Sequence, residues 1–188
     1  MRKGVPWVVG AALAAAAGLI TVMTPSPDAL RAPILEHVRF DPDAVSQRPV
    51  VARTLTTAVI DAGFAESVEI DDWRADGNWL VVTIAASAPR SEVDAVIELA
   101  TLRVGDEIFH PSERVRGSLL GEQLRIGIDT IGMLAFELPA DITSGDAELW
   151  LSSSYLTPRL DDVAAVMIPL DQLPTASSIE ITPPEPVS

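Results

Sequence analysis

The sequence predicts an all-β protein, an antiparallel β-sandwich preceded by one N-terminal transmembrane helix. The first observation is an uncharged apolar stretch near the N-terminus, from Val5 to Met23. The second is a series of about eight short apolar segments with a period of two, separated by turn residues, which is the pattern of a sandwich. The third is size, because about 160 residues remain after the apolar stretch, enough for one domain with its own core.

Residues 1–23 are predicted to be a transmembrane anchor. The stretch from Val5 to Met23 is 19 residues long, which as a helix covers nearly the hydrocarbon thickness of a bilayer. Arg2 and Lys3 precede it and an acidic chain follows, so the N-terminus is expected in the cytoplasm and the domain outside the cell membrane. A cleaved signal peptide remains the main alternative, because the alanine-rich centre is only mildly hydrophobic, and a buried soluble helix is a third.

Two proline-containing segments bound the predicted sandwich at residues 34–173. Residues 24–33 contain three prolines and are expected to be an extended linker that spaces the domain from the membrane. Residues 174–188 contain four prolines and few large apolar side chains. This C-terminal tail is expected to be disordered.

The strands are predicted from runs and alternation of apolar residues. Trp79 to Ala86 is a continuous, largely β-branched run that follows Asp76-Gly77-Asn78, interpreted as a turn. Leu134, Phe136 and Leu138 alternate with smaller or charged residues, so they should face the core, and Pro139 should end the strand. Residues 100–109 form a predicted hairpin with its turn at Gly105. Further strands are predicted at residues 50–60, 67–71, 124–128, 147–151 and 163–168.

One segment, residues 92–103, fits two structures. Val93, Val96, Ile97 and Ala100 match the spacing of an amphipathic helix, and Ser91 could cap it. A strand is favoured because the residues from Glu98 onward can pair in register with the second strand of the hairpin. A single helix packed on a sheet would leave the fold class unchanged.

The charge and the absence of cysteine exclude several classes of function. The formal net charge is −14 and the chain has no cysteine. From Thr24 onward, the chain has 11 arginines and 27 carboxylates. This negative charge disfavours nucleic-acid binding. Disulfides, thiolate metal sites and a cysteine nucleophile are impossible. Without a phosphate-binding glycine loop, nucleotide binding is not expected, and no cofactor is predicted.

No catalytic residue is predicted. The two histidines are His37 and His110, and we expect both to lie on the surface. His110-Pro111-Ser112-Glu113 contains acid and base groups but is interpreted as a polar loop that follows a strand. The segment from Gly117 to Gly121 lacks the spacing of a nucleophile elbow.

Calcium is the one metal that the sequence allows us to consider, and no metal site is predicted. The loop carboxylates do not follow the 12-residue calcium-loop spacing, since Thr83 occupies the twelfth position from Asp72. We interpret them as solvated turn residues. Trp73, Trp79 and Trp150 are assigned to core packing rather than to a ligand platform. The carboxylates considered are Asp41 with Asp43; Asp71 and Asp72 with Asp76; and Asp161 with Asp162.

Three segments carry a family resemblance: residues 76–82 (DGNWLVV), 102–109 (LRVGDEIF) and 132–139 (GMLAFELP). Their order is similar to a bacterial family of extracytoplasmic immunoglobulin-like domains of unknown function, some labelled after a telomeric repeat-binding factor. It also resembles single-pass actinobacterial membrane proteins of that architecture. The resemblance implies an immunoglobulin-like sandwich and carries no catalytic residue. The chain departs from the pattern at residues 85–88, where Ala-Ala-Ser-Ala replaces an Asn that often ends the first strand.

Together these features predict a membrane-tethered extracytoplasmic binding or accessory module without catalytic activity. Its partners are expected to be the membrane, through the N-terminal helix, and a protein or cell-envelope component. The alternative is a carboxylate-based extracytoplasmic hydrolase, which the fold class does not exclude. That alternative requires several carboxylates to converge in one pocket.

Overall fold

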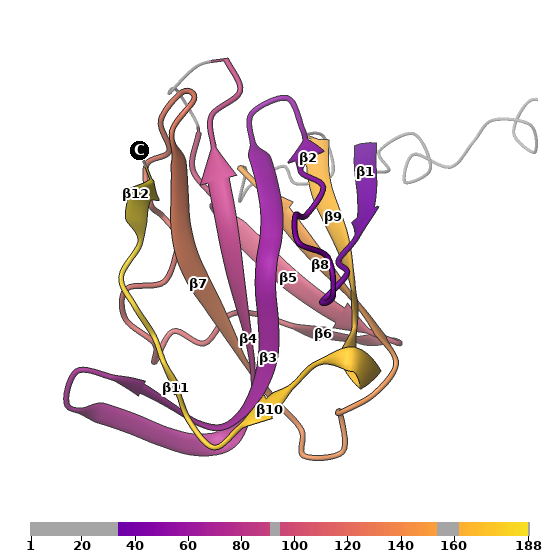
Figure 1. Ribbon diagram of the computed structural model, residues 1–188, viewed down its shortest axis with the longest axis vertical. Helices are drawn as coiled ribbons and strands as arrows, with labels where there is room; N and C mark the ends of the chain where they lie inside the picture. Colours follow the sequence, from indigo (N-terminus) through magenta and orange to yellow (C-terminus); the bar gives the residue numbers. More distant parts are fainter. Residues whose placement is uncertain (1–33, 91–94, 154–161, 188) are drawn as a thin grey trace, which may run out of the picture. The chain divides into compact units, whose positions relative to one another are not determined.

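Two β-sheets pack face to face in a computed structural model, which describes residues 34–90, 95–153 and 162–187 (Figure 1). These residues belong to one compact unit. They contain no α-helix, only the short 3₁₀ helix η1 (Leu170–Gln172). None of the described residues forms a helix long and apolar enough to cross a bilayer. The predicted anchor and linker, residues 1–33, lie outside the described residues.

The first sheet has the strand order β1-β9-β8-β5-β6. Strand β1 pairs with β9 in parallel, and the other pairs are antiparallel. The predicted all-β sandwich is confirmed, but its strand pairs are not all antiparallel, because β1, which follows the predicted linker, pairs in parallel with the last long strand. The bounds are β1 (Ile34–Arg39), β9 (Asp162–Pro169), β8 (Asp146–Ser152), β5 (Leu99–Val104) and β6 (Glu107–Phe109).

The second sheet has the order β10-β3-β4-β7-β12, and β2 and β11 also pair with β3. Strands β10 and β11 run parallel to β3, while β4, β7 and β12 form antiparallel pairs. The bounds are β2 (Val50–Val51), β3 (Thr56–Ile70), β4 (Trp73–Ser87), β7 (Asp129–Leu138), β10 (Thr175–Ala176), β11 (Ile179–Glu180) and β12 (Glu185–Val187).

The main core lies between the sheets. Leu134, Phe136 and Leu138 of β7 are buried there, as their alternation predicts. Leu102, Leu149 and Leu151 meet them from the first sheet, and all three are fully buried. The hairpin at residues 100–109 is confirmed as β5 and β6, and Gly105 occupies the left-handed region at φ 58°.

Strands β3 and β4 form one long antiparallel hairpin, and its turn does not lie at the predicted position. Asp76-Gly77-Asn78 belongs to β4, so the prediction of a turn there was wrong. The pairing passes from Ala65↔Trp79 to Ser67↔Asp76, which makes this segment part of a β-bulge. Bulges and turns favour the same residue types, because both bend the backbone. The true turn contains Asp71, at φ 50°, and the part of the hairpin beyond the bulge bends away from the sheet in Figure 1.

A second, smaller core covers the outer face of the second sheet. Val81 and Ala135 are cross-strand partners that point away from the main core, and Trp79 is fully buried beside them. The bent end of the hairpin, the loop after β6 and the C-terminal tail close this core. Its buried members are Ala65, Val68, Ile70, Ala75, Trp79, Val81, Val115, Ala135 and Ile181.

The prediction that residues 174–188 are disordered was wrong for residues 174–187, which the structure describes. Residues 175–187 include β10, β11 and β12, and Ile181 is buried in the second core. The prolines lie between these short strands or at positions compatible with edge pairing, so they do not interrupt the ladders. The folded domain therefore extends beyond residue 173, along the edges of β3 and β7 (Figure 1).

The segment predicted as strand or helix contains no helix where the structure describes it, and its second half is a strand. Residues 91–94 lie outside the described part, Val96 forms an isolated bridge with Gln123, and β5 begins at Leu99. The strand prediction is thus confirmed from Leu99 onward. The strand predicted at residues 124–128 was wrong, because only isolated bridges occur there. Those predicted at 147–151 and 163–168 are confirmed as β8 and β9.

Candidate functional site

A cavity lies at the end of the bent hairpin, and we call it the hairpin-tip site. Its volume is about 530 Å³, within the range of sites that hold small ligands. Ile70 ends β3, Asp71 and Asp72 form the turn, and Trp73 begins β4. The opposite wall comes from the loop after β6. The lining residues are Ile70, Asp71, Asp72, Trp73, Arg114 and Arg116.

The loop that supplies the arginines is fixed against β7 at two points. Ser112 N donates to Ala135 O at 2.8 Å, and Leu119 N donates to Met133 O at 3.1 Å. Between these points, Val115 is buried in the second core. Because Val115 points inward, its two neighbours are left at the surface, where Arg114 and Arg116 both line the cavity.

The two arginines differ in their contacts. The Arg114 guanidinium lies over the Trp73 ring, with Cζ 5.5 Å from the ring centroid, a cation–π arrangement. Its Nη1 is also 3.4 Å from Glu137 Oε2. Arg116 is exposed and forms no hydrogen bond or ion pair within the described part of the chain. One cation is therefore held in place and the other is available to a ligand.

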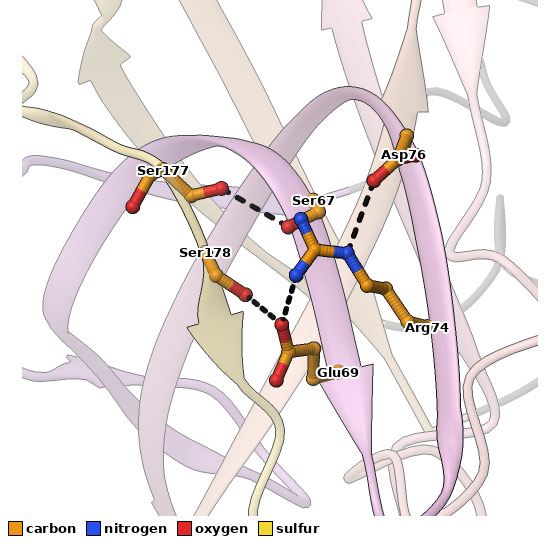
Figure 2. Close-up of polar contacts among 6 residues, drawn as sticks. All are labelled: Ser67, Glu69, Arg74, Asp76, Ser177 and Ser178. Carbon is orange, nitrogen blue, oxygen red and sulfur yellow. Dashed lines mark hydrogen bonds and ion pairs between the residues drawn. The ribbon is translucent and has the colours of Figure 1, made fainter.

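A polar network fastens the hairpin to the C-terminal tail next to this site (Figure 2). Arg74 donates to Glu69 Oε1 at 2.6 Å and to Asp76 Oδ1 at 3.1 Å. From the tail, Ser178 Oγ donates to the same Glu69 oxygen at 2.8 Å. The hydrogen bond to Asp76 is the largest of the effects that raise the pKa of Arg74, so the guanidinium stays charged.

Main-chain contacts complete this junction. Ile181 N donates to Glu69 O at 2.7 Å. The buried Ser67 donates from Oγ to Ser177 O at 3.0 Å. Side chains and backbone of β3 thus bind the same stretch of tail, next to the strand end that leads into the hairpin-tip site.

A second cavity, of about 260 Å³, lies on the outer face of the second sheet, between β3, β4, β7 and residues 174–179. Its walls are mainly apolar, and the one carboxylate in them, Asp61, accepts from Ala62 N at 2.9 Å. This cavity offers a ligand fewer polar partners than the hairpin-tip site does.

None of the residues first considered for acid–base chemistry lines the hairpin-tip site. His37 is exposed on β1, and its Nδ1 is 3.3 Å from Glu148 Oε1. His110, Ser112 and Glu113 all belong to the described loop after β6, where no hydrogen bond joins their side chains to one another. The loop interpretation of this segment is confirmed.

The carboxylates considered for calcium do not form one cluster. Asp71 and Asp72 line the hairpin-tip site, whereas Asp76 pairs with Arg74. Asp41 Oδ1 accepts from Asp43 N at 3.1 Å, a local turn contact. Asp161 lies outside the described residues, as does the side chain of Asp162. Within the described ranges, no three His, Asp or Glu side chains gather where they could hold a metal ion.

The tryptophans have more varied surroundings than the sequence indicated. Trp79 is fully buried, as predicted. Trp73 and Trp150 are only partly buried, and each has an arginine over its ring: Arg114 over Trp73, and Arg103 over Trp150 at 4.5 Å. The Arg-Val-Arg alternation at residues 114–116 was the available signal for the tip site, but nothing in it indicates which segment lies opposite.

Comparisons of the chain with protein-family models, with curated proteins and with solved structures found no match.

Proposed function

We propose that this chain is a membrane-tethered extracytoplasmic binding or accessory module, which contacts a protein or cell-envelope component through the hairpin-tip site. The observation that carries the proposal is the composition of that site. Two guanidinium groups, two carboxylates and a partly buried tryptophan line one open cavity, between a hairpin bonded to the C-terminal tail and a loop hydrogen-bonded to β7. Such convergent polar groups in a concave site are typical of ligand recognition.

The distribution of carboxyl groups favours binding over hydrolysis. Among the side chains that the structure describes, no Asp or Glu is fully buried, and only Glu69 and Glu148 are partly buried. Glu69 pairs with Arg74, and Glu148 lies beside His37. Carboxylates that act as general acids usually need an apolar, desolvated setting that raises their pKa. The carboxylate-based hydrolase therefore has less support than the binding module.

Attachment to the membrane and the immunoglobulin-like classification are parts of the same proposal. The apolar stretch from Val5 to Met23, with basic residues before it, supports an anchor with the domain outside. The two packed sheets support the immunoglobulin-like classification together with the sequence resemblance. Protease added to intact spheroplasts should degrade the domain of the membrane-bound chain. Recovery of unprocessed protein in the soluble fraction would contradict the anchor.

Site-specific photocrosslinking tests the binding site itself. A photoreactive amino acid would replace Asp72, at the hairpin tip, or Asp106, at the β5–β6 turn, in the full-length chain in its native membrane. Both aspartates are exposed residues of hairpin turns, so they are matched. We expect a discrete crosslinked product from position 72 and none of the same size from position 106. Equal products, or none at position 72, would contradict a contact at the hairpin tip.

A further inference from the structure

We propose that the hairpin-tip site binds the carboxyl-terminal end of a peptide, with Arg116 and Arg114 receiving the carboxylate and Asp71 or Asp72 accepting from neighbouring N–H groups. This inference rests on the proposed function and assigns its ligand class. Guanidinium groups match a carboxylate in shape and can bind it through two parallel hydrogen bonds.

The charges of the cavity walls narrow the choice of anion. Two guanidinium groups lie on the loop wall, and two carboxylates lie on the hairpin wall. A ligand with several negative charges, such as a polyphosphate or a nucleic acid, meets repulsion from Asp71 and Asp72 and from the acidic domain as a whole. A ligand with one anionic group and nearby N–H donors satisfies both walls. The end of a peptide chain has this arrangement.

The surroundings of Trp73 favour a peptide over an acidic sugar. A sugar ring commonly needs an open aromatic face on which to stack, whereas the Trp73 ring already carries the Arg114 guanidinium and packs against the second core. The same contact restricts the motion of Arg114, so less side-chain entropy is lost when an anion binds. Arg114 thus offers the ligand an oriented cation, and the face of the Trp73 ring that it covers is not available for stacking.

Arg116 is the better residue for a test. It forms no ion pair within the described residues, so its replacement should leave the fold intact, whereas Arg114 also contacts Trp73 and Glu137. Arg125 provides the matched control. It is likewise exposed, and its carbonyl accepts a hydrogen bond from Ala88 N. Ala88 follows the last residue of β4, at the end of that strand far from the hairpin tip.

The experiment measures binding of trialanine to the full-length chain in detergent micelles, by titration calorimetry. Trialanine with a free carboxyl terminus should bind saturably, and the same peptide amidated at that terminus should bind at least about tenfold more weakly. Arg116→Gln should weaken binding of the free acid by about tenfold or more, whereas Arg125→Gln should leave it unchanged.

Three results would overturn the assignment: equal affinity for the acid and the amide, equal loss in both arginine variants, or tighter binding of inorganic phosphate or glucuronate than of trialanine. The crosslinking experiment distinguishes these results from a failure of the proposed function. A crosslink from position 72 without trialanine binding would leave the contact site in place and remove only the peptide ligand. Loss of the crosslink would remove the contact site itself.

Discussion

Arg74 lies directly opposite Glu69 across the β3–β4 ladder, and its Nη1 donates to Glu69 Oε1 at 2.6 Å. The same oxygen accepts from Ser178 Oγ, and the Glu69 carbonyl accepts from Ile181 N. One residue of the hairpin therefore binds the C-terminal tail through its side chain, as Figure 2 shows, and also through its backbone. This junction joins the tail to the structure that carries the hairpin-tip site.

Removal of the Ser178 hydroxyl should loosen this junction. We expect Ser178→Ala to lower the free energy of unfolding by about 0.5–1.5 kcal/mol, because one hydrogen bond to a carboxylate is lost. Urea denaturation of the purified chain measures the change. Glu66→Ala, an exposed substitution on the same strand as Glu69, serves as the control and should change stability by less than about 0.5 kcal/mol. Equal effects of the two substitutions would show that the Ser178 contact contributes nothing.

Ile181 should account for most of the apolar contribution of the tail to stability. Its side chain is only 2% exposed, and its truncation leaves a cavity in the second core. Ile181→Ala should therefore cost about 2–4 kcal/mol of unfolding free energy, measured by the same denaturation experiment. Thr175→Ala, at an exposed position of the same tail, should be nearly neutral. A nearly neutral Ile181→Ala would mean that the tail is not packed as described.

Gly132 should not tolerate a side chain. A Cβ at this position would lie 2.9 Å from Leu119 Cδ1 and 3.0 Å from Leu119 Cβ, and the Leu119 backbone is hydrogen-bonded to Met133. Gly132→Ala should destabilise the domain by about 1–3 kcal/mol through overpacking, as measured by thermal unfolding.

Gly63 is the control for this steric effect. A Cβ there would meet its nearest atom, Pro174 O, at 3.4 Å, so Gly63→Ala should have little effect. A double-mutant cycle of Gly132→Ala with Leu119→Ala should show coupling of about 0.5 kcal/mol or more, because Leu119→Ala removes Cδ1, the nearer of the two clashing atoms, and leaves only the contact with Cβ. Strict additivity would contradict this explanation.

Gly105 should be required for its backbone conformation alone. Its φ is 58°, and a Cβ added to it would meet no atom within 4 Å, so a side chain there has space but a strained backbone. Gly105→Ala should cost about 1 kcal/mol, and Gly105→Asn clearly less, because Asn tolerates the left-handed region. Chemical denaturation of both variants checks the order. A more stable Ala variant than Asn variant would contradict it.

The sequence by itself determined the local features of this protein. Alternation placed Leu134, Phe136 and Leu138 in the main core, and Gly105 marked the β5–β6 turn, because these features depend on neighbouring residues and on the two-residue period of a strand.

Only the tertiary structure decided the bend at Asp76-Gly77-Asn78, the pairing of the tail and the composition of the hairpin-tip site. The tail pairs with strand edges more than 50 residues away, as in Glu185↔Ile131. The proline content of the tail does not indicate whether a distant strand has an edge free to pair with it. Similarly, Trp73 and Arg114 are distant in the sequence and meet at the end of the hairpin that lies beyond the bulge. Such contacts join distant segments, and no local pattern specifies which ones will meet.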